Sequence, residues 1–282
     1  DAVCGRREPR ALLSATSRRR GRKRKLNNLA QATWVEFRKA RRSKMPLFTA
    51  LGFAMVPLGG GFFMIVLKDP DMARRVGLIS TKAQLTMGAA DWPTYLRFLT
   101  MAIGAGGIIL FGLVAAWVFG REYSDRTAKD LLALPTSRSA IVLSKCVVIA
   151  VWSAALTVVI CLITLCVGAA LGLPPAAPQV FWQSGITIMV AVCLTISLTT
   201  PIAFAASAWR GYLPPIAVMI LAMVVAQLTT AAGWGEYFPW AIPALFVQGE
   251  KLGAISYAIV VLTGIIGLAG TILWWELADQ TR

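Results

Sequence analysis

Residues 140–171 read AIVLSKCVVIAVWSAALTVVICLITLCVGAAL, an apolar run in which Lys145 is the only charged residue. A helix needs about 20 mostly apolar residues to cross a bilayer, so this run is long enough to span the membrane and to project beyond it. Lys145 lies near the beginning of the run, where we expect its long side chain to extend to the aqueous boundary. The stretch therefore predicts a membrane-spanning helix.

Five further apolar runs predict an all-α, polytopic membrane protein with six transmembrane helices. They cover residues 47–67, 98–119, 181–208, 214–232 and 253–275. Pro201 is expected to kink the helix over 181–208, because proline lacks the N–H that continues the helical hydrogen bonds. The composition agrees, with 57% hydrophobic and 15% charged residues, against about 45–50% and about 25% in globular chains.

The sequence divides into four parts. Residues 1–28 are expected to be a basic, disordered cytoplasmic tail, and residues 29–46 an amphipathic connecting helix. The transmembrane domain covers residues 47–275, and residues 276–282 form a cytoplasmic C-terminus. In a membrane protein we expect the basic tail to bind the anionic lipid surface rather than nucleic acid.

The distribution of Lys and Arg predicts the orientation in the membrane. Residues 1–46 contain 15 Lys and Arg but 3 Asp and Glu. With six spans, one side of the membrane receives 22 of the 28 basic residues and the other side receives 6. Basic residues concentrate in cytoplasmic segments, so both termini and residues 120–139 are expected in the cytoplasm.

Several chemistries are excluded by the residues that are missing. The sequence has no His and no GxxxxGK[ST] motif, and its five Cys form no CxxC pair. A His-dependent nucleophile, a His-ligated metal and a phosphate-binding loop of this type are therefore absent. We find no ionisable residue deep within the spans, which disfavours a carboxylate-based proton or sodium pathway.

The loop between the second and third spans is the most informative segment. Residues 120–135 read GREYSDRTAKDLLALP. Ser124 or Asp125 can cap a short helix that ends before Pro135, and Glu122 can pair with Arg126 or with a partner. The residues alone leave two interpretations open: an amphipathic helix that docks on another protein, or a solvated loop.

Two other segments are amphipathic or apolar without spanning the membrane. On residues 29–44, Trp34 and Phe37 fall on one helical side, whereas Arg38 and Lys39 fall largely opposite, so this helix should lie on the anionic leaflet. The run YFPWAIPALFV at 237–247 is too short to span. It is typical of either a re-entrant segment or a loop on the lipid headgroups.

The loop GREYSDRTAKDLLALP, with RSAIVLSK at 138–145, resembles the coupling loop of ATP-binding-cassette (ABC) type-2 exporter permeases. The resemblance covers residues 29–275 and is closest to permeases of bacitracin and lantibiotic self-protection and of sodium or drug export. It implies that residues of three segments carry the function. These are Arg121, Glu122, Tyr123, Ser124, Asp125, Arg126, Lys129, Leu131, Leu134 and Pro135 in the ATPase-coupling loop, Trp34, Phe37, Arg38 and Arg41 in the connecting helix, and Tyr237, Phe238, Pro239, Trp240 and Pro243 in an outer re-entrant segment.

The resemblance also implies the partners. Two copies of a separate ATPase would bind ATP and Mg, and a second permease copy would complete a homo- or heterodimer in the bacterial inner membrane. This chain would carry no catalytic residue, cofactor or metal and would bind no nucleic acid.

The expected function is therefore the export of a drug, peptide antibiotic or lipid-like molecule. Uncharged spans with aromatic residues such as Trp117, Trp152 and Phe204 suit an amphipathic cargo. Three alternatives remain: a sodium-exporting permease, a lipid-modifying enzyme and a non-transporting scaffold. The acidic residues Glu122, Asp125 and Asp130 do not reproduce the DxxD-rich metal sites of lipid transferases. Glycines within the spans indicate either close helix packing or flexible sites along a substrate path.

Overall fold

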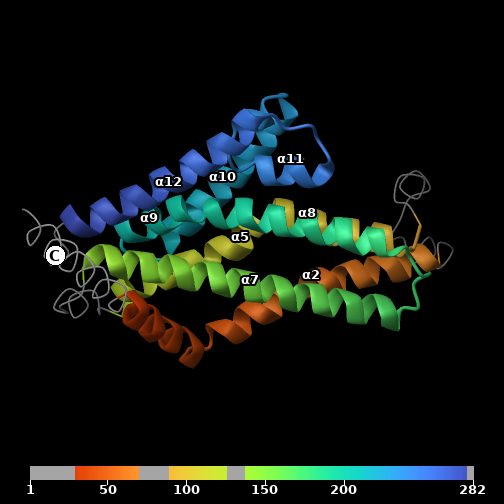
Figure 1. Cartoon of the computed structure of the whole chain (residues 1–282), viewed down its shortest axis with the longest axis horizontal. Helices are drawn as coiled ribbons and strands as arrows, with labels where there is room; N and C mark the ends of the chain where they lie inside the picture. Colours follow the sequence, from red (N-terminus) through yellow and green to blue (C-terminus); the bar gives the residue numbers. More distant parts are fainter. Residues whose placement is uncertain (1–28, 70–88, 126–136, 278–282) are drawn as a thin grey trace, which may run out of the picture.

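The computed structural model describes residues 29–69, 89–125 and 137–277, and over these ranges all regular structure is helical (Figure 1). Six helical segments are long and apolar enough to cross a membrane, which confirms the predicted all-α polytopic fold. They are α2 (Met45–Lys68), α5 (Trp92–Ser124), α7 (Arg138–Ala170), α8 (Pro178–Ser197) with α9 (Thr200–Ala208), α10 (Leu213–Ala231) and α12 (Ala254–Leu277). Residues 29–42 form a further N-terminal helix, and the predicted tail at 1–28 lies outside the described residues.

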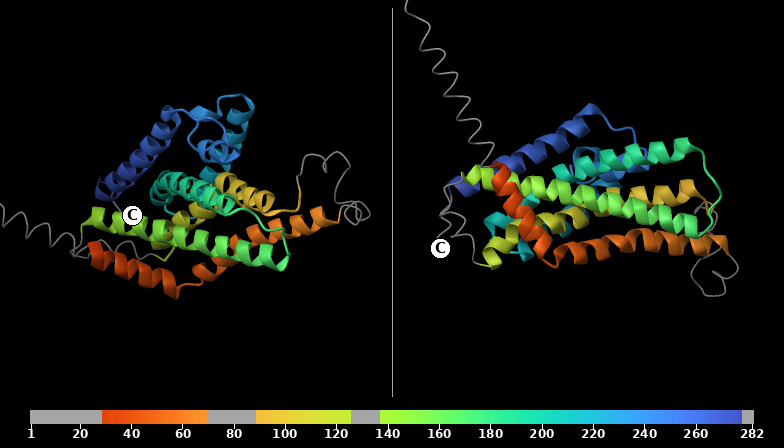
Figure 2. Two further views of the ribbon diagram at one scale, coloured as in Figure 1. Left: turned by 45° about the vertical axis from the view of Figure 1, so that its right-hand side comes forward. Right: turned by 60° about the horizontal axis from the view of Figure 1, so that its bottom comes forward.

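Successive spans run in alternating directions through an elongated bundle (Figures 1 and 2). We call one end proximal: it holds the N-terminal helix, the end of α5, the start of α7 and the end of α12. The distal end holds the end of α2, the start of α5 and residues 171–177 between α7 and α8. Both described ends of the chain are therefore proximal, as an even number of spans requires.

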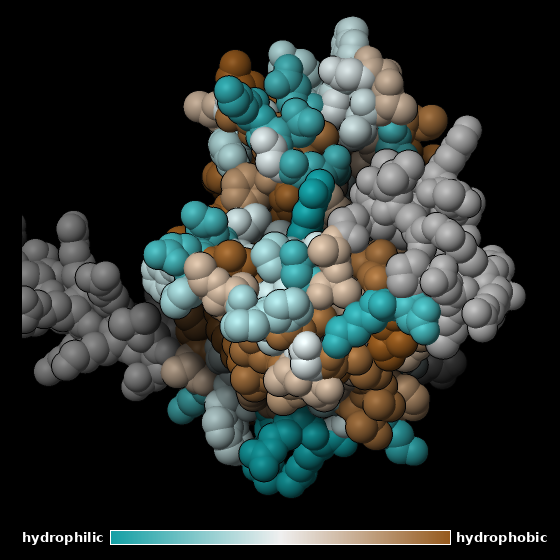
Figure 3. Space-filling model, turned by 90° about the vertical axis from the view of Figure 1, so that its right-hand side faces the viewer, coloured by the Kyte–Doolittle hydropathy of each residue, from teal (hydrophilic) through white to brown (hydrophobic). Residues whose placement is uncertain are grey.

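Helix α5 is the centre of the bundle. It contacts α2, α7, α8, α9, α10 and α11 (Ile242–Gln248), and its side chains Leu99, Ile103, Phe111 and Phe119 are buried. Large apolar side chains on the outer helices are exposed, for example Met55, Val158, Leu221 and Ile266. Hydrophobic areas reach the surface between hydrophilic clusters when the bundle is viewed from its distal end (Figure 3). An apolar exterior of this kind is stable in lipid.

The fourth span is interrupted where proline predicts a kink. Helix α8 ends at Ser197 and α9 begins at Thr200, with Pro201 in the first turn of α9. Proline has no N–H to donate to the preceding turn. The Thr200 hydroxyl instead donates to the Ser197 carbonyl at 3.1 Å and also contacts the Gly264 carbonyl of α12 at 2.6 Å. The break therefore fixes α9 against α12.

Several glycines within the spans lie where two helices pack closely, which supports close packing as their role. A Cβ at Gly267 would lie 2.5 Å from the Pro201 nitrogen, and one at Gly104 would lie 2.5 Å from a Val247 methyl group. Cβ atoms at Gly59 and Gly106 would meet nothing within 4 Å. Small residues thus allow α12 to approach α9, and α11 to approach α5.

The segment after α10 folds back onto the bundle. A single 3-10 turn, η1 (Gly235–Tyr237), is followed by a turn over 238–241 and by α11, which packs against α5 and α8. Phe238 and Trp240 have ring centroids 5.5 Å apart, and Pro243 lies in the first turn of α11 and is buried. Gly249, at φ +85°, ends the helix in a left-handed conformation that favours glycine. The predicted assignment of this segment to the outer side of the membrane stays a prediction.

Candidate coupling site

A buried lysine organises the proximal end of the bundle. Lys145, on the second turn of α7, is fully buried, and its ammonium has three acceptors. It donates to Glu122 Oε1 at 2.8 Å, to Glu36 Oε2 at 2.9 Å and to the Val118 carbonyl at 3.2 Å. An ammonium has three protons to donate, so these contacts satisfy all of them. The expectation that Lys145 extends to the aqueous boundary was wrong, because two carboxylates inside the protein replace water.

A second lysine completes this ion-pair cluster, which we define as Glu36, Lys39, Glu122 and Lys145. Lys39 Nζ lies 2.9 Å from Glu36 Oε1 and 3.2 Å from Glu122 Oε1, and its side chain is 28% exposed. Burial lowers the pKa of Lys39, but the carboxylates of Glu36 and Glu122 together raise it above its ordinary value. The cluster thus joins two carboxylates to two ammonium groups, so that their formal charges balance.

The ion-pair cluster connects three elements that are far apart in the sequence. Glu36 and Lys39 belong to the N-terminal helix, Glu122 to the last turn of α5 and Lys145 to α7. Removing one partner of a buried pair typically costs about 3–5 kcal/mol, because an uncompensated charge remains. The cluster therefore holds the three helices in one arrangement.

A second set of contacts fixes the start of α7 to the end of α12. Arg138 donates from Nη1 to the carbonyls of Trp275 at 3.0 Å and Glu276 at 3.2 Å. A cation at a helix C-terminus satisfies carbonyls that have no partner within the helix. Trp275 is itself buried and donates from Nε1 to the Ser207 hydroxyl of α9 at 3.1 Å.

These contacts fix the end of α5 and the start of α7, the two described helix ends on either side of residues 126–136. On the α5 side, Tyr123 packs edge-on against Trp275 with ring centroids 6.3 Å apart. The Arg121 guanidinium lies 4.8 Å from the centre of the Trp117 ring and 3.6 Å from the Asp125 carboxylate. A displacement of these two helix ends would therefore act on α5, α7, α12 and the N-terminal helix together.

The predicted loop begins later than the sequence indicates. Arg121, Glu122, Tyr123 and Ser124 continue α5, and Asp125 is its C-cap. Polar residues continue the helix here because Glu122 meets Lys145 on its buried side. The remaining predicted coupling residues lie outside the described residues: Arg126, Lys129, Leu131, Leu134 and Pro135. Their grouping into a short docking helix stays a prediction.

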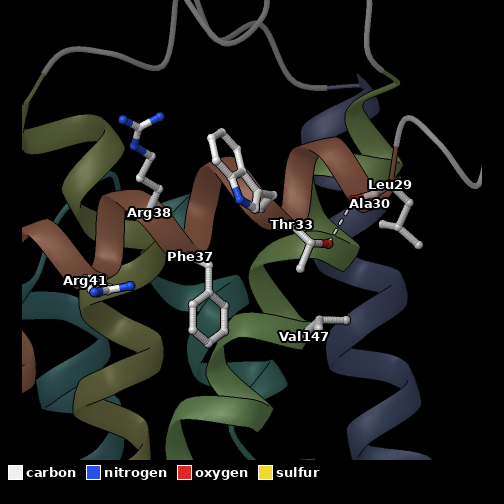
Figure 4. A pocket seen from close by; sticks show the side chains of 8 residues that line it. Leu29, Ala30, Thr33, Phe37, Arg38, Arg41 and Val147 are labelled. Carbon is white, nitrogen blue, oxygen red and sulfur yellow. Dashed lines mark hydrogen bonds between the residues drawn. The ribbon is translucent and has the colours of Figure 1, made fainter.

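The N-terminal helix contacts the bundle through Glu36 and Ala40 rather than through its aromatic side chains. Glu36 and Ala40 are buried, whereas Trp34 is 61% exposed and Phe37 is 42% exposed. Figure 4 shows Phe37 on the side facing α7, near Val147, with Arg38 extending to the other side. Lys39, which the sequence places largely opposite Trp34 and Phe37, reaches Glu122 of α5 with its ammonium.

Sequence reasoning missed Glu36 and Lys39 and misplaced Lys145. One signal was available: Glu36 and Ala40 are four residues apart and share a helical face. A lone carboxylate on that face needs a cation, and Lys145 is the only charged residue in its span. Nothing in the sequence indicates that these groups meet.

The acidic side chains beside the ion-pair cluster that the structure describes are engaged by basic side chains. Glu122 is occupied by two lysines, and Asp125 lies beside Arg121. Within residues 29–69, 89–125 and 137–277, no three Cys, Asp or Glu side chains gather closely enough to hold a metal ion. The ion-pair cluster and Arg138 instead attach the helices to one another at the proximal end.

Comparison with known proteins places these helices in a recognised group. The family described as "ABC-2 family transporter protein" matches residues 32–227, a range that includes the whole ion-pair cluster. The bacitracin transport permease protein BCRB of Bacillus licheniformis is 28% identical over 177 residues, which cover 61% of this chain and 85% of that protein. No solved structure matches.

Lys145→Met is expected to destabilise the protein strongly. It leaves Glu36 and Glu122 with one lysine between them, at a cost of about 3–5 kcal/mol. The double variant Glu122→Gln, Lys145→Met keeps the neutral pair Glu36–Lys39 and should recover most of that loss. The measurement is the free energy of unfolding of the purified protein in mixed micelles.

The matched control is Asp125→Asn, which removes the exposed pair with Arg121 and should cost about 0–1 kcal/mol. Equal stability of Lys145→Met and Asp125→Asn would show that the ion-pair cluster does not hold the helices together.

Proposed function

The chain belongs to the ABC-2 family of transporter proteins, and we propose that it moves amphipathic or apolar molecules out of the cell with energy from a separate ATPase. It is a multi-pass membrane permease of an ABC exporter. The observation that carries the proposal is that the ion-pair cluster and Arg138 fix the end of α5 and the start of α7, which lie on either side of residues 126–136.

In the proposed mechanism, the ATPase acts on the segment that connects α5 and α7. ABC-2 permeases generally work with an ATPase partner, and this sequence has no GxxxxGK[ST] motif of its own. ATP and Mg would bind to two ATPase copies, which approach each other and displace the segment 126–136. Because Lys145 ties α5 and α7 to the N-terminal helix, the displacement tilts these helices together and opens the path for the substrate.

The proposed substrate is an amphipathic molecule such as a drug, peptide antibiotic or lipid-like compound. The bacitracin transport permease similarity supports this class. Two of the aromatic side chains in the spans contact other parts of the bundle. Trp117 and Trp152 have ring centroids 5.8 Å apart, and the Trp152 indole donates to the Thr49 hydroxyl at 3.3 Å. The ion-pair cluster uses the end of α5 and the start of α7, and the six spans contain no Asp or Glu between their ends, so a sodium ion has no carboxylate at mid-span.

The substrate class is tested with the reconstituted permease–ATPase complex. We expect bacitracin or another amphipathic peptide to raise the ATPase activity severalfold, while replacing KCl with NaCl leaves it unchanged. Stimulation by sodium alone would instead support the sodium-exporting alternative.

The proposed orientation places the proximal end in the cytoplasm, because the N-terminal helix, the end of α5 and the start of α7 carry most of the Lys and Arg among the described residues. In a variant without native cysteines, Ala89→Cys should react with an impermeant maleimide added to intact cells. Ser137→Cys should react only after the membrane is permeabilised. Both positions are exposed at the surface of the protein. The reverse pattern of labelling would invert the orientation.

The docking segment is tested with Leu131→Asp and Leu134→Asp. If these leucines enter a groove on the ATPase, each variant buries an unpaired charge, which costs several kcal/mol, roughly 3–5. ATPase pull-down should then be lost at normal membrane levels of the permease. Ala89→Asp, which adds the same charge at the distal end, is the control and should bind normally. Undiminished binding of the leucine variants would remove this segment from the mechanism.

A further inference from the structure

Two grooves run along the N-terminal helix where it lies beside α7. The first has a volume of about 790 Å³, and Phe37, Arg38, Arg41 and Val147 are among its lining residues (Figure 4). The second has a volume of about 260 Å³ and lies between the same helix and residues 148–159 of α7. Phe37 and Arg41 line both grooves, so the two adjoin at these side chains.

The second groove has the dimensions and chemistry of a site for a hydrocarbon chain. Its α7 wall includes Val151, Ala155 and Val159, and the other side chains from α7 are also apolar. Residues 148–159 cover roughly 16 Å of helix at about 1.5 Å per residue. A lipid acyl chain can lie along such a wall, which starts at the proximal end and continues into the transmembrane part of α7.

The mouth of this groove is positively charged. Arg41 lines the groove, is exposed and lies four residues before α2. No acceptor in the part of the chain that the structure describes is seen to pair with the Arg41 guanidinium. The helix's carboxylate, Glu36, is turned away to Lys39 and Lys145. A guanidinium at the start of a membrane span is at the level of lipid phosphates, which it binds through charge-assisted hydrogen bonds.

We propose that this cleft binds one anionic phospholipid from the leaflet that meets the N-terminal helix. The lipid phosphate contacts Arg41, and one acyl chain lies along Val151, Ala155 and Val159 of α7. The bound lipid bridges the same two helices that Glu36 and Lys145 connect inside the bundle. Anionic lipid would therefore stabilise the position of the N-terminal helix, a role that goes beyond the transport of a substrate.

The test uses the full-length permease and native mass spectrometry with equimolar dioleoylphosphatidylglycerol and dioleoylphosphatidylcholine. The wild-type protein should retain phosphatidylglycerol in clear preference to phosphatidylcholine. Arg41→Gln should weaken phosphatidylglycerol retention about tenfold, equivalent to ~1.4 kcal/mol, and should abolish the preference. Ala155→Phe, which fills the groove on α7, should reduce retention of both lipids.

Two neighbouring residues provide matched controls. Arg42→Gln removes the same charge from an exposed position outside the groove, and Ala154→Phe adds the same bulk to an exposed position of α7 outside the groove. Both should retain lipid as the wild type does. Equal retention of the two lipids by the wild type would overturn the proposal, as would equal losses in the controls. A change of oligomeric state in Ala155→Phe would also overturn it, because the occupant would then be a second copy of the chain.

Discussion

The positive charge of Lys145 has to be neutralised inside the protein, and the proximal end of the bundle is arranged around that requirement. A buried ammonium without partners would lose its proton or prevent folding. Glu36 and Glu122 approach it to 2.9 and 2.8 Å, and each comes from a different helix. The pairing therefore brings the N-terminal helix, α5 and α7 together at a point where apolar packing alone would not specify which helices meet.

Ion pairs and hydrogen bonds join the helix ends at the proximal end of the bundle. The end of α5 is held by Glu122, and the start of α7 is held by Lys145 and by Arg138, which caps the last turn of α12. Trp275 links the same region to α9 through Ser207. In the proposed mechanism this is the region where an ATPase would apply force. Polar contacts suit that task because they are directional, whereas the apolar faces of the spans can slide in lipid.

The rest of the bundle depends on close approach between helices rather than on charge. Gly267 allows α12 to contact the broken span at Pro201, and Gly104 allows α11 to contact α5. Side chains such as Met55 and Val158 remain exposed without cost in lipid, because the surrounding hydrocarbon is as apolar as they are. The N-terminal helix differs from these spans, because its aromatic and basic side chains border a groove beside α7. This is the groove in which we place a bound lipid.

The sequence by itself determined the six spans, their alternation and the break at Pro201, because length, apolarity and a missing N–H act locally along the chain. It also singled out Glu122 and the segment that follows it. It did not determine that α5 continues through Ser124, that Lys39 faces the bundle or that Lys145 is buried. Only the tertiary structure decided these points. Glu36 and Lys145 are 109 residues apart, and their charges can be buried only because the fold brings them together.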